Sequence, residues 1–237
     1  MAYLEQTRAS AVREFAPAQA HDDDAWTTYL RSPRAKTFRL SQHEVIFYEG
    51  DPAERIYELA EGAIMLYKLL PDGRRQVVEI LGPGDLFGFP VADMHDCAAE
   101  TLVPTLVRAL RRQDIETASG LQQHVTHCLL SQMETLHNHA VLLGRKSAME
   151  RVASFLMQFV PSRGGPGCTG PVDEDNDESV VLLTMTRQEI ADYLGLTIET
   201  VSRVISEMKR RSLIRIEKQD RIRIMKVCDI CHLTGAH

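Results

Sequence analysis

Short apolar runs separated by turn residues fill the chain between about residue 36 and residue 112. Glycine, proline and aspartate mark the turns, as in PDG and GPGD, which follow two of the runs. Strands of this length at intervals of about ten residues are typical of an antiparallel sandwich or barrel. The pattern predicts an antiparallel β-roll, with strands at residues 45–48, 56–59, 63–70, 77–81 and 105–110.

The pattern then becomes helical, because no glycine or proline interrupts residues 121–143. Within this stretch an apolar residue recurs at spacings of four, three, four and three, at Leu129, Met133, Leu136, Ala140 and Leu143. Such a narrow seam packs against a partner helix. A long helix that packs on its own domain would give a broader apolar face. The seam therefore favours homodimerisation through this helix.

A second helix is predicted at residues 147–159, followed by a loop rich in Gly, Pro and Asp at residues 161–178. The segment RQEIADYLGLTIETVSRVIS, residues 187–206, comes next. Thr186 and Glu189 have capping-box spacing, which begins a helix. Gly195 ends that helix, and a threonine two residues later can cap the next one. Two short helices joined by a tight glycine turn predict a helix-turn-helix.

Three polar residues share one face of the second helix, because Glu199, Ser202 and Arg203 are three and four positions apart. Arginine can donate two hydrogen bonds to guanine, glutamate can accept one from cytosine, and serine suits several bases. The alternative is a solvated helix face with an ion pair between Glu199 and Arg203. The complete helix-turn-helix pattern favours DNA base reading over that alternative.

Residues 213–217 and 221–226 alternate around KQD, which predicts a β-hairpin wing. Basic wing residues and residues at the two helix starts are expected at DNA phosphates. This expected backbone-contact set is Thr186, Arg187, Thr197, Thr200, Lys218 and Arg221.

Charge is divided unevenly along a chain of 237 residues whose net charge is −6. Residues 187–226 hold ten basic and six acidic side chains, a net +4 that leaves −10 for the remainder. This division suggests separate roles, with the basic segment suited to nucleic acid.

The 5 cysteines are too few and too scattered for a disulfide scaffold. No apolar stretch approaches a membrane span, and the N-terminus has no secretory pattern, so a cytoplasmic protein without membrane partners is expected.

The segment TRQEIADYLGLTIETVSRVISEMKRRSLI, residues 186–214, resembles the DNA-binding signature of the CRP/FNR family of bacterial transcription regulators. YKLLPDGRRQVV at 67–78, GDLFGF at 84–89 and ERVASF at 150–155 are similar to its FixK-like branch. The resemblance covers about residues 36–226. It implies a dimer that reads a palindrome of the type TTGAT…ATCAA and activates promoters by contacting RNA polymerase, in low-oxygen, denitrification or nitrogen-fixation control.

The resemblance also raises three kinds of sensory ligand. An iron–sulfur cluster needs clustered N-terminal cysteines, and the first cysteine is Cys97. Cyclic AMP needs an arginine for its phosphate, and residues 89–101 contain none. Both ligands are therefore excluded, and no cofactor is expected. Haem would need an axial ligand from His95 or Cys97, although residues of these types beside a β-turn are more often surface and core residues. A haem- or small-ligand-sensing regulator stays open as the alternative.

Several cysteine and histidine positions near the C-terminus leave open questions. Cys168, in the predicted loop, is either inert or a redox brake whose oxidation reduces DNA binding. Cys228, Cys231 and His232 have the spacing of a c-type haem attachment site. A zinc site built from Cys228, Cys231, His232 and His237 is a second interpretation, and a frayed or packed C-terminal turn is the third.

The predicted fold class is α+β, with a cupin-like β-roll, a long dimerisation helix and a winged helix-turn-helix. A metal-dependent β-roll enzyme is disfavoured because His43 and His95 stand alone, without the His-x-His pair that such enzymes need. The predicted divisions are a flexible leader, the β-roll, the long helix, the DNA-binding domain and a tail, at 1–24, 25–118, 119–145, 146–226 and 227–237.

Overall fold

The computed structural model describes residues 24–161, 163, 168, 170, 177–218 and 220–235. The predicted leader at 1–24, apart from its last residue, and most of the predicted loop at 161–178 lie outside these residues. The chain forms two compact units that divide between Ala140 and Val141.

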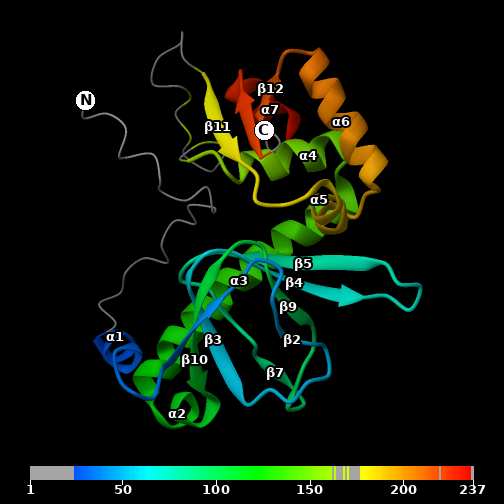
Figure 1. Ribbon diagram of the computed structural model, residues 1–237. Coiled ribbons are helices and arrows are strands. Elements are labelled where there is room, and N and C mark those ends of the chain that lie inside the picture. Colours follow the sequence, from blue (N-terminus) through cyan, green and yellow to red (C-terminus); the bar gives the residue numbers. More distant parts are fainter. Residues whose placement is uncertain are drawn as a thin grey trace. The chain divides into compact units, whose positions relative to one another are not determined.

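The first unit is a roll of two antiparallel four-stranded sheets (Figure 1). One sheet has the strand order β1 (Lys36–Leu40), β10 (Thr105–Arg111), β3 (Arg55–Glu61) and β6 (Leu86–Phe87). The other has the order β2 (Val45–Phe47), β9 (Ala98–Thr101), β4 (Ile64–Leu69) and β5 (Arg75–Leu81). A two-stranded ribbon adds β7 (Pro90–Val91) and β8 (Met94–His95).

Buried side chains, which alternate with more exposed ones along the strands, fill the space between the two sheets of the roll. In β5 every second residue from Val77 is buried, so one face of the strand forms core and the other meets solvent. One apolar cluster within the roll includes Phe47, Leu59 and Phe87. A second cluster joins the roll to three helices, α1 (Asp24–Leu30), α2 (Arg112–Thr117) and α3 (Ser119–Arg145).

In the second unit, the last turn of α3 is followed by α4 (Ala148–Met157), which Ser147 and Glu150 start with a capping box. A three-stranded sheet has the order β11 (Ser179–Leu182), β13 (Arg221–Ile224) and β12 (Ile214–Lys218). The remaining helices are α5 (Arg187–Leu194), α6 (Ile198–Arg210) and α7 (Val227–Leu233).

The predicted fold class and the five predicted strands of the roll are confirmed. The pattern did not reveal β1, because four of its five residues are exposed and it therefore lacks the alternation of a half-buried strand. It also did not reveal α1, which buries Trp26 and Tyr29 against the roll. The tail is a packed helix rather than a frayed turn, since α7 buries Val227 and Ile230.

Candidate nucleic-acid interface

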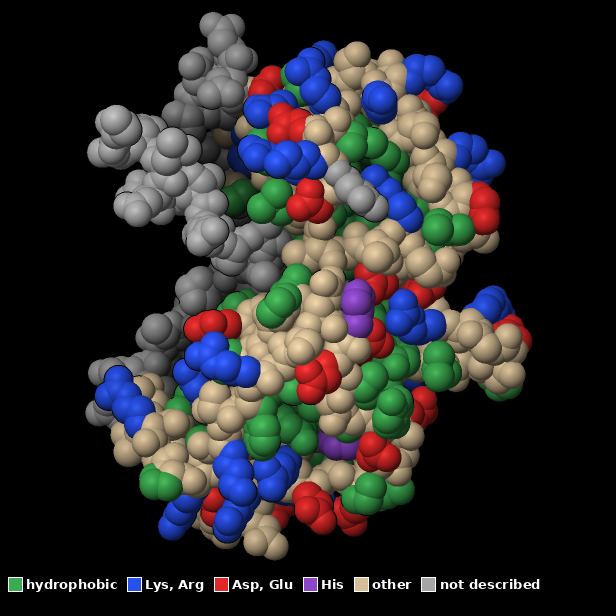
Figure 2. Space-filling model, viewed as in Figure 1, with side chains coloured by type: hydrophobic (Ala, Val, Ile, Leu, Met, Phe, Trp, Pro, Cys, Tyr) green, Lys and Arg blue, Asp and Glu red, His purple; other side chains and the backbone are tan. Residues whose placement is uncertain are grey.

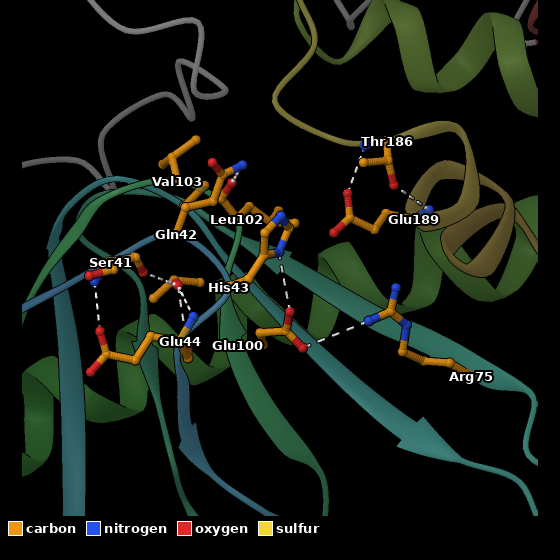
Figure 3. Close-up of polar contacts among 12 residues, drawn as sticks. Ser41, Gln42, His43, Glu44, Arg75, Glu100, Leu102, Val103, Thr186 and Glu189 are labelled. Carbon is orange, nitrogen blue, oxygen red and sulfur yellow. Dashed lines mark hydrogen bonds and ion pairs between the residues drawn. The ribbon is translucent and has the colours of Figure 1, made fainter.

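The capping residues predicted from the sequence mark both ends of helix α5. Glu189 Oε2 accepts from the Thr186 backbone N–H at 2.6 Å, and Thr186 Oγ1 accepts from the Glu189 N–H at 3.2 Å (Figure 3). Gly195 ends the helix in the left-handed conformation, with φ 60° and ψ 40°. A side chain is disfavoured at those angles, so glycine fixes the turn into the next helix.

Small and branched apolar residues hold α5 and α6 together. Ala191 is completely buried, which lets the helices approach closely. The Leu196 N–H donates to the Ala191 carbonyl at 3.0 Å, so the turn is closed by the backbone as well. The buried residues of the pair include Ile190, Ala191, Leu194, Val201, Val204 and Ile205.

The first turn of α6 holds its polar side chains by local hydrogen bonds. Thr197 Oγ1 accepts from the Thr200 N–H at 3.2 Å and lies 3.1 Å from the Thr200 hydroxyl. The backbone N–H of Glu199 and the Thr197 side chain lower the pKa of the Glu199 carboxyl, because both stabilise its charged form. Glu199 is therefore an ionised acceptor at the start of this helix.

The three predicted base-reading residues are brought together on the outer face of α6. Glu199, Ser202 and Arg203 are all exposed, while Val201 and Met208 on the opposite face are buried. Among the described residues, Glu199 and Arg203 form no ion pair with each other, so the intrahelical pair of the alternative interpretation is not formed. The face offers an unpaired guanidinium, a carboxylate and a hydroxyl, which match base edges.

Some cations of the second unit form ion pairs with carboxylates, and others do not. Glu217 lies 2.9 Å from Arg221 and 2.5 Å from Arg223, so these wing arginines are already paired. Lys218 and Arg203 have no ion pair with another described residue. Figure 2 shows Lys and Arg side chains spread over the visible surface of this unit. Unpaired cations are the ones available to phosphates without losing an internal contact.

Arg187 differs from the other members of the expected backbone-contact set. Its side chain is half-buried, and burial lowers the pKa of its guanidinium. Nη1 is buried without a hydrogen-bond partner among the described atoms. Such a group gains a partner when an anion approaches, which fits a phosphate contact at the start of α5.

Arg151 is a positioning residue that the sequence pattern did not reveal. Its guanidinium donates to the carbonyl of Leu194 at 2.8 Å, beside the helix-turn-helix turn, and to Leu143 at 2.6 Å, near the end of α3. Its Nε donates to the Lys146 carbonyl at 2.9 Å. One side chain thus ties the turn before α6 to the end of α3. Only its place in the resembling segment ERVASF marked it in advance.

An apolar face of α3 is open in the described chain. Leu129, Met133 and Leu136 are 42%, 48% and 41% exposed, and Ala140 is exposed as well, whereas Leu143 is half-buried. Leu130, at 57% exposed, widens this face beyond the predicted seam.

A cavity of about 410 Å³ in the first unit lies between the roll and α3. Leu129, Met133 and Leu136 line it from the helix side, and Phe87 and Phe89 are among the residues that line it from the roll. Three residues of the predicted dimer seam therefore also border this cavity.

The polar residues of the cavity do not suit a cyclic nucleotide. Its lining contains Glu79 and Asp96 and no lysine or arginine, so a cyclic phosphate would meet carboxylates instead of a cation. Burial lowers the pKa of His95, which keeps the imidazole neutral. Burial and Asp96 raise the pKa of the Cys97 thiol to about 12. Of the two candidate haem ligands, His95 has the required form and Cys97 does not, since a ligating thiol must be deprotonated.

The comparisons with known proteins agree with this arrangement. A model of the Crp-like helix-turn-helix domain matches residues 150–233, and a model of the cyclic nucleotide-binding domain matches residues 37–119. The nitrogen fixation regulation protein FixK of Rhizobium meliloti is 38% identical over 181 residues, which cover 76% of this chain and 79% of that protein. The chain belongs to the CRP/FNR family of transcription regulators. Within it, the chain is FixK-like.

Two further FixK proteins support the assignment. FixK of Bradyrhizobium diazoefficiens is 36% identical, over 75% of this chain and 73% of that protein. The structure of FixK2 from Bradyrhizobium japonicum aligns with a TM-score of 0.71 and 34% identity, over 84% of this chain and 96% of that one. These relatives are regulators rather than enzymes, so the β-roll enzyme alternative is excluded. Among the described helices, none combines the length and apolar character needed to cross a membrane.

Proposed function

We propose that the protein acts as a homodimer that reads a palindromic promoter site through α6. The observation that carries this proposal is the outer face of α6, where Glu199, Ser202 and Arg203 are exposed together. Arg203 supplies two donors for guanine O6 and N7, and Glu199 supplies an acceptor for cytosine N4. In FNR-like members of the family, this reading set implies a site of the type TTGAT…ATCAA.

Homodimerisation is supported by the exposed apolar face of α3. Leu130 and Met133 are about half exposed, and exposed apolar residues gathered on one face mark an interaction site. A second copy of the helix would bury this face and place two α6 helices for two half-sites. Thr186, Arg187, Thr197, Thr200, Lys218 and Arg221 would contact the phosphates flanking each half-site.

The regulator is proposed to work in the cytoplasm without a cyclic nucleotide or an iron–sulfur cluster. The carboxylates of the cavity support a function without a cyclic nucleotide, and the cysteine positions support a function without an iron–sulfur cluster. Activation would require contact with RNA polymerase, for which the hairpin turn at residues 71–75 is suited because Leu69 and Leu70 beside it are exposed. The names of the FixK relatives support a role in nitrogen fixation control, and the family resemblance extends the proposal to low-oxygen respiration or denitrification.

Selection of bound sequences from random DNA tests the proposal directly. The purified full chain should enrich a two-fold symmetric site with TTGAT-like half-sites, and sedimentation should show a dimer at the protein concentrations used. Enrichment of an asymmetric site, or of no sequence above background, would contradict it. A metal and pigment analysis of the same sample distinguishes the haem alternative, which requires a stoichiometric haem.

A further inference from the structure

Three of the five cysteines gather in the second unit. Cys228 and Cys231 lie on α7, and Cys168 comes from the segment between α4 and β11, about 60 positions earlier. Burial raises the pKa of the Cys231 thiol, and the nearby charges of Cys168 and Cys228 raise it further. Cys228 and Cys168 are half-buried, whereas Cys231 is only 6% exposed.

One guanidinium connects two of these sulfur atoms. Arg163 Nη2 donates to Cys228 Sγ at 3.1 Å, and the Arg163 side chain also hydrogen-bonds Cys168. Asp177 holds Arg163 in place at 2.7 Å and accepts the Cys228 backbone N–H at 2.8 Å. Cysteines react as thiolates, and a cation that donates to sulfur favours the thiolate. Asp177 opposes that effect, but its carboxylate is engaged by the arginine and the backbone.

We propose that Cys168 and Cys228 are a thiol pair that hydroperoxides oxidise to a disulfide. The described residues hold no group of three or more suitable ligands for a metal ion, and His237, one of the four residues of the zinc interpretation, lies outside them. Cys228 is the residue oxidised first, because its sulfur accepts the hydrogen bond from the Arg163 guanidinium at 3.1 Å. Cys168 is the resolving residue, because the guanidinium that donates to Cys228 also hydrogen-bonds Cys168.

The reaction has two balanced steps. The Cys228 thiolate attacks one peroxide oxygen, so that an S–O bond forms while the O–O bond breaks and hydroxide leaves. The sulfur loses two electrons to the peroxide and becomes a sulfenic acid. Cys168 then attacks this sulfur, an S–S bond forms, and the S–O bond breaks. The departing hydroxide takes the Cys168 proton and leaves as water.

Peptide mapping under non-reducing conditions tests the pair. The reduced full chain, treated with a small excess of hydrogen peroxide, should lose two of its five thiols and yield a linked peptide containing Cys168 and Cys228. In Cys168→Ser the reaction should stop at the Cys228 sulfenic acid, which dimedone traps. Cys231→Ser is the matched control and should keep the linkage. A disulfide joining Cys228 to Cys231 instead, or no linkage at all, would overturn the proposal.

The role of Arg163 has its own measurement. In Arg163→Ala the rate of linkage should fall about threefold, since a smaller thiolate fraction is partly offset by greater nucleophilicity of each thiolate. Arg163→Lys retains the charge and should react at an intermediate rate. It also shows whether any loss in the alanine variant reflects unfolding, because it preserves a pairing with Asp177. Equal rates in all three proteins would contradict a role for the guanidinium.

Discussion

In the β-roll, the buried carboxylate of Glu58 accepts hydrogen bonds from Trp26 Nε1 at 3.3 Å and from Arg108 Nη1 at 2.7 Å. On α6, by contrast, Arg203 is exposed and has no carboxylate partner among the described residues. A buried charge must be paired, because an unpaired one costs free energy of folding. An exposed guanidinium without a partner adds little to stability and is free to bind a ligand. Glu58 therefore stabilises the fold, whereas Arg203 is available for recognition.

The same contrast holds between the cavity and the DNA-binding surface. The cavity is bordered by apolar side chains together with Glu79 and Asp96, whose carboxylates would repel a phosphate. The second unit leaves cations such as Lys218 exposed and outside ion pairs among the described residues. Of the two units, the second is therefore the one suited to a polyanion, although the first has the fold of a nucleotide-binding domain.

The largest effect is expected from Leu136→Glu. This change places a charge in the exposed apolar face of α3, and in a dimer it would place two like charges at the interface, which costs several kcal/mol. Sedimentation should show monomers, and specific DNA binding should disappear. Gln123→Glu puts the same charge at an exposed position elsewhere on α3 and should leave both properties unchanged. A Leu136→Glu protein that stays dimeric would move the interface away from this face.

Arg151→Ala should have the next largest effect. It removes hydrogen bonds to the carbonyls of Leu143, Lys146 and Leu194, which should cost about 2–4 kcal/mol of unfolding free energy in the second unit. Urea unfolding measures this loss, with the exposed neighbour Arg145→Ala as the control. DNA affinity should fall in parallel. Unchanged stability would mean that solvent satisfies those carbonyls and that Arg151 does not position the turn.

A pH dependence is expected from the first unit. Burial and the hydrogen bond to Asp114, 2.6 Å long, raise the pKa of Tyr29 from 10 to about 12. Folding therefore favours the protonated phenol, and its contribution is complete below pH 10 and is lost as the pH rises to about 12. The loss amounts to about 2–3 kcal/mol. Unfolding free energies of wild type and Tyr29→Phe should converge across this window, and a constant difference would contradict the linkage.

The smallest expected effect is a difference in the salt dependence of DNA binding between variants of two wing cations, Lys218 and Arg221. Lys218→Ala should weaken binding to all DNA sequences and reduce the slope of log affinity against log salt by about 1. Arg221→Ala should change the slope less, because Glu217 already pairs with Arg221. Titrations at several salt concentrations measure both slopes. Equal changes would show that the Glu217 pair opens when DNA binds.

The second unit could be predicted from sequence more fully than the first. The capping box of Thr186, the left-handed Gly195 and the cap at Thr197 are local signals, and the structure confirms all three. The strands of the roll were predictable where one face is buried. Strand β1 was not, because it is exposed along most of its length.

Contacts between distant parts of the chain were beyond the sequence pattern. Trp26 reaches Glu58 across 32 positions, and Arg163 reaches Cys228 across 65. Arg151 has no charged partner in its helix, so spacing rules give no sign of its carbonyl contacts. The ion pair of Glu217 with Arg221 likewise depends on the register of the hairpin, which the strand pattern alone does not define.

Base reading by Arg203 is tested by measuring the affinities of wild type and Arg203→Ala for the selected site and for sites with each base pair swapped. Wild type should discriminate against one swap per half-site by about 1–3 kcal/mol, and Arg203→Ala should lose that discrimination at the same base pair. Lys209→Ala, a change to another exposed cation on α6, should weaken binding without altering base preference. Full discrimination at every base pair in Arg203→Ala would show that Arg203 does not read a base.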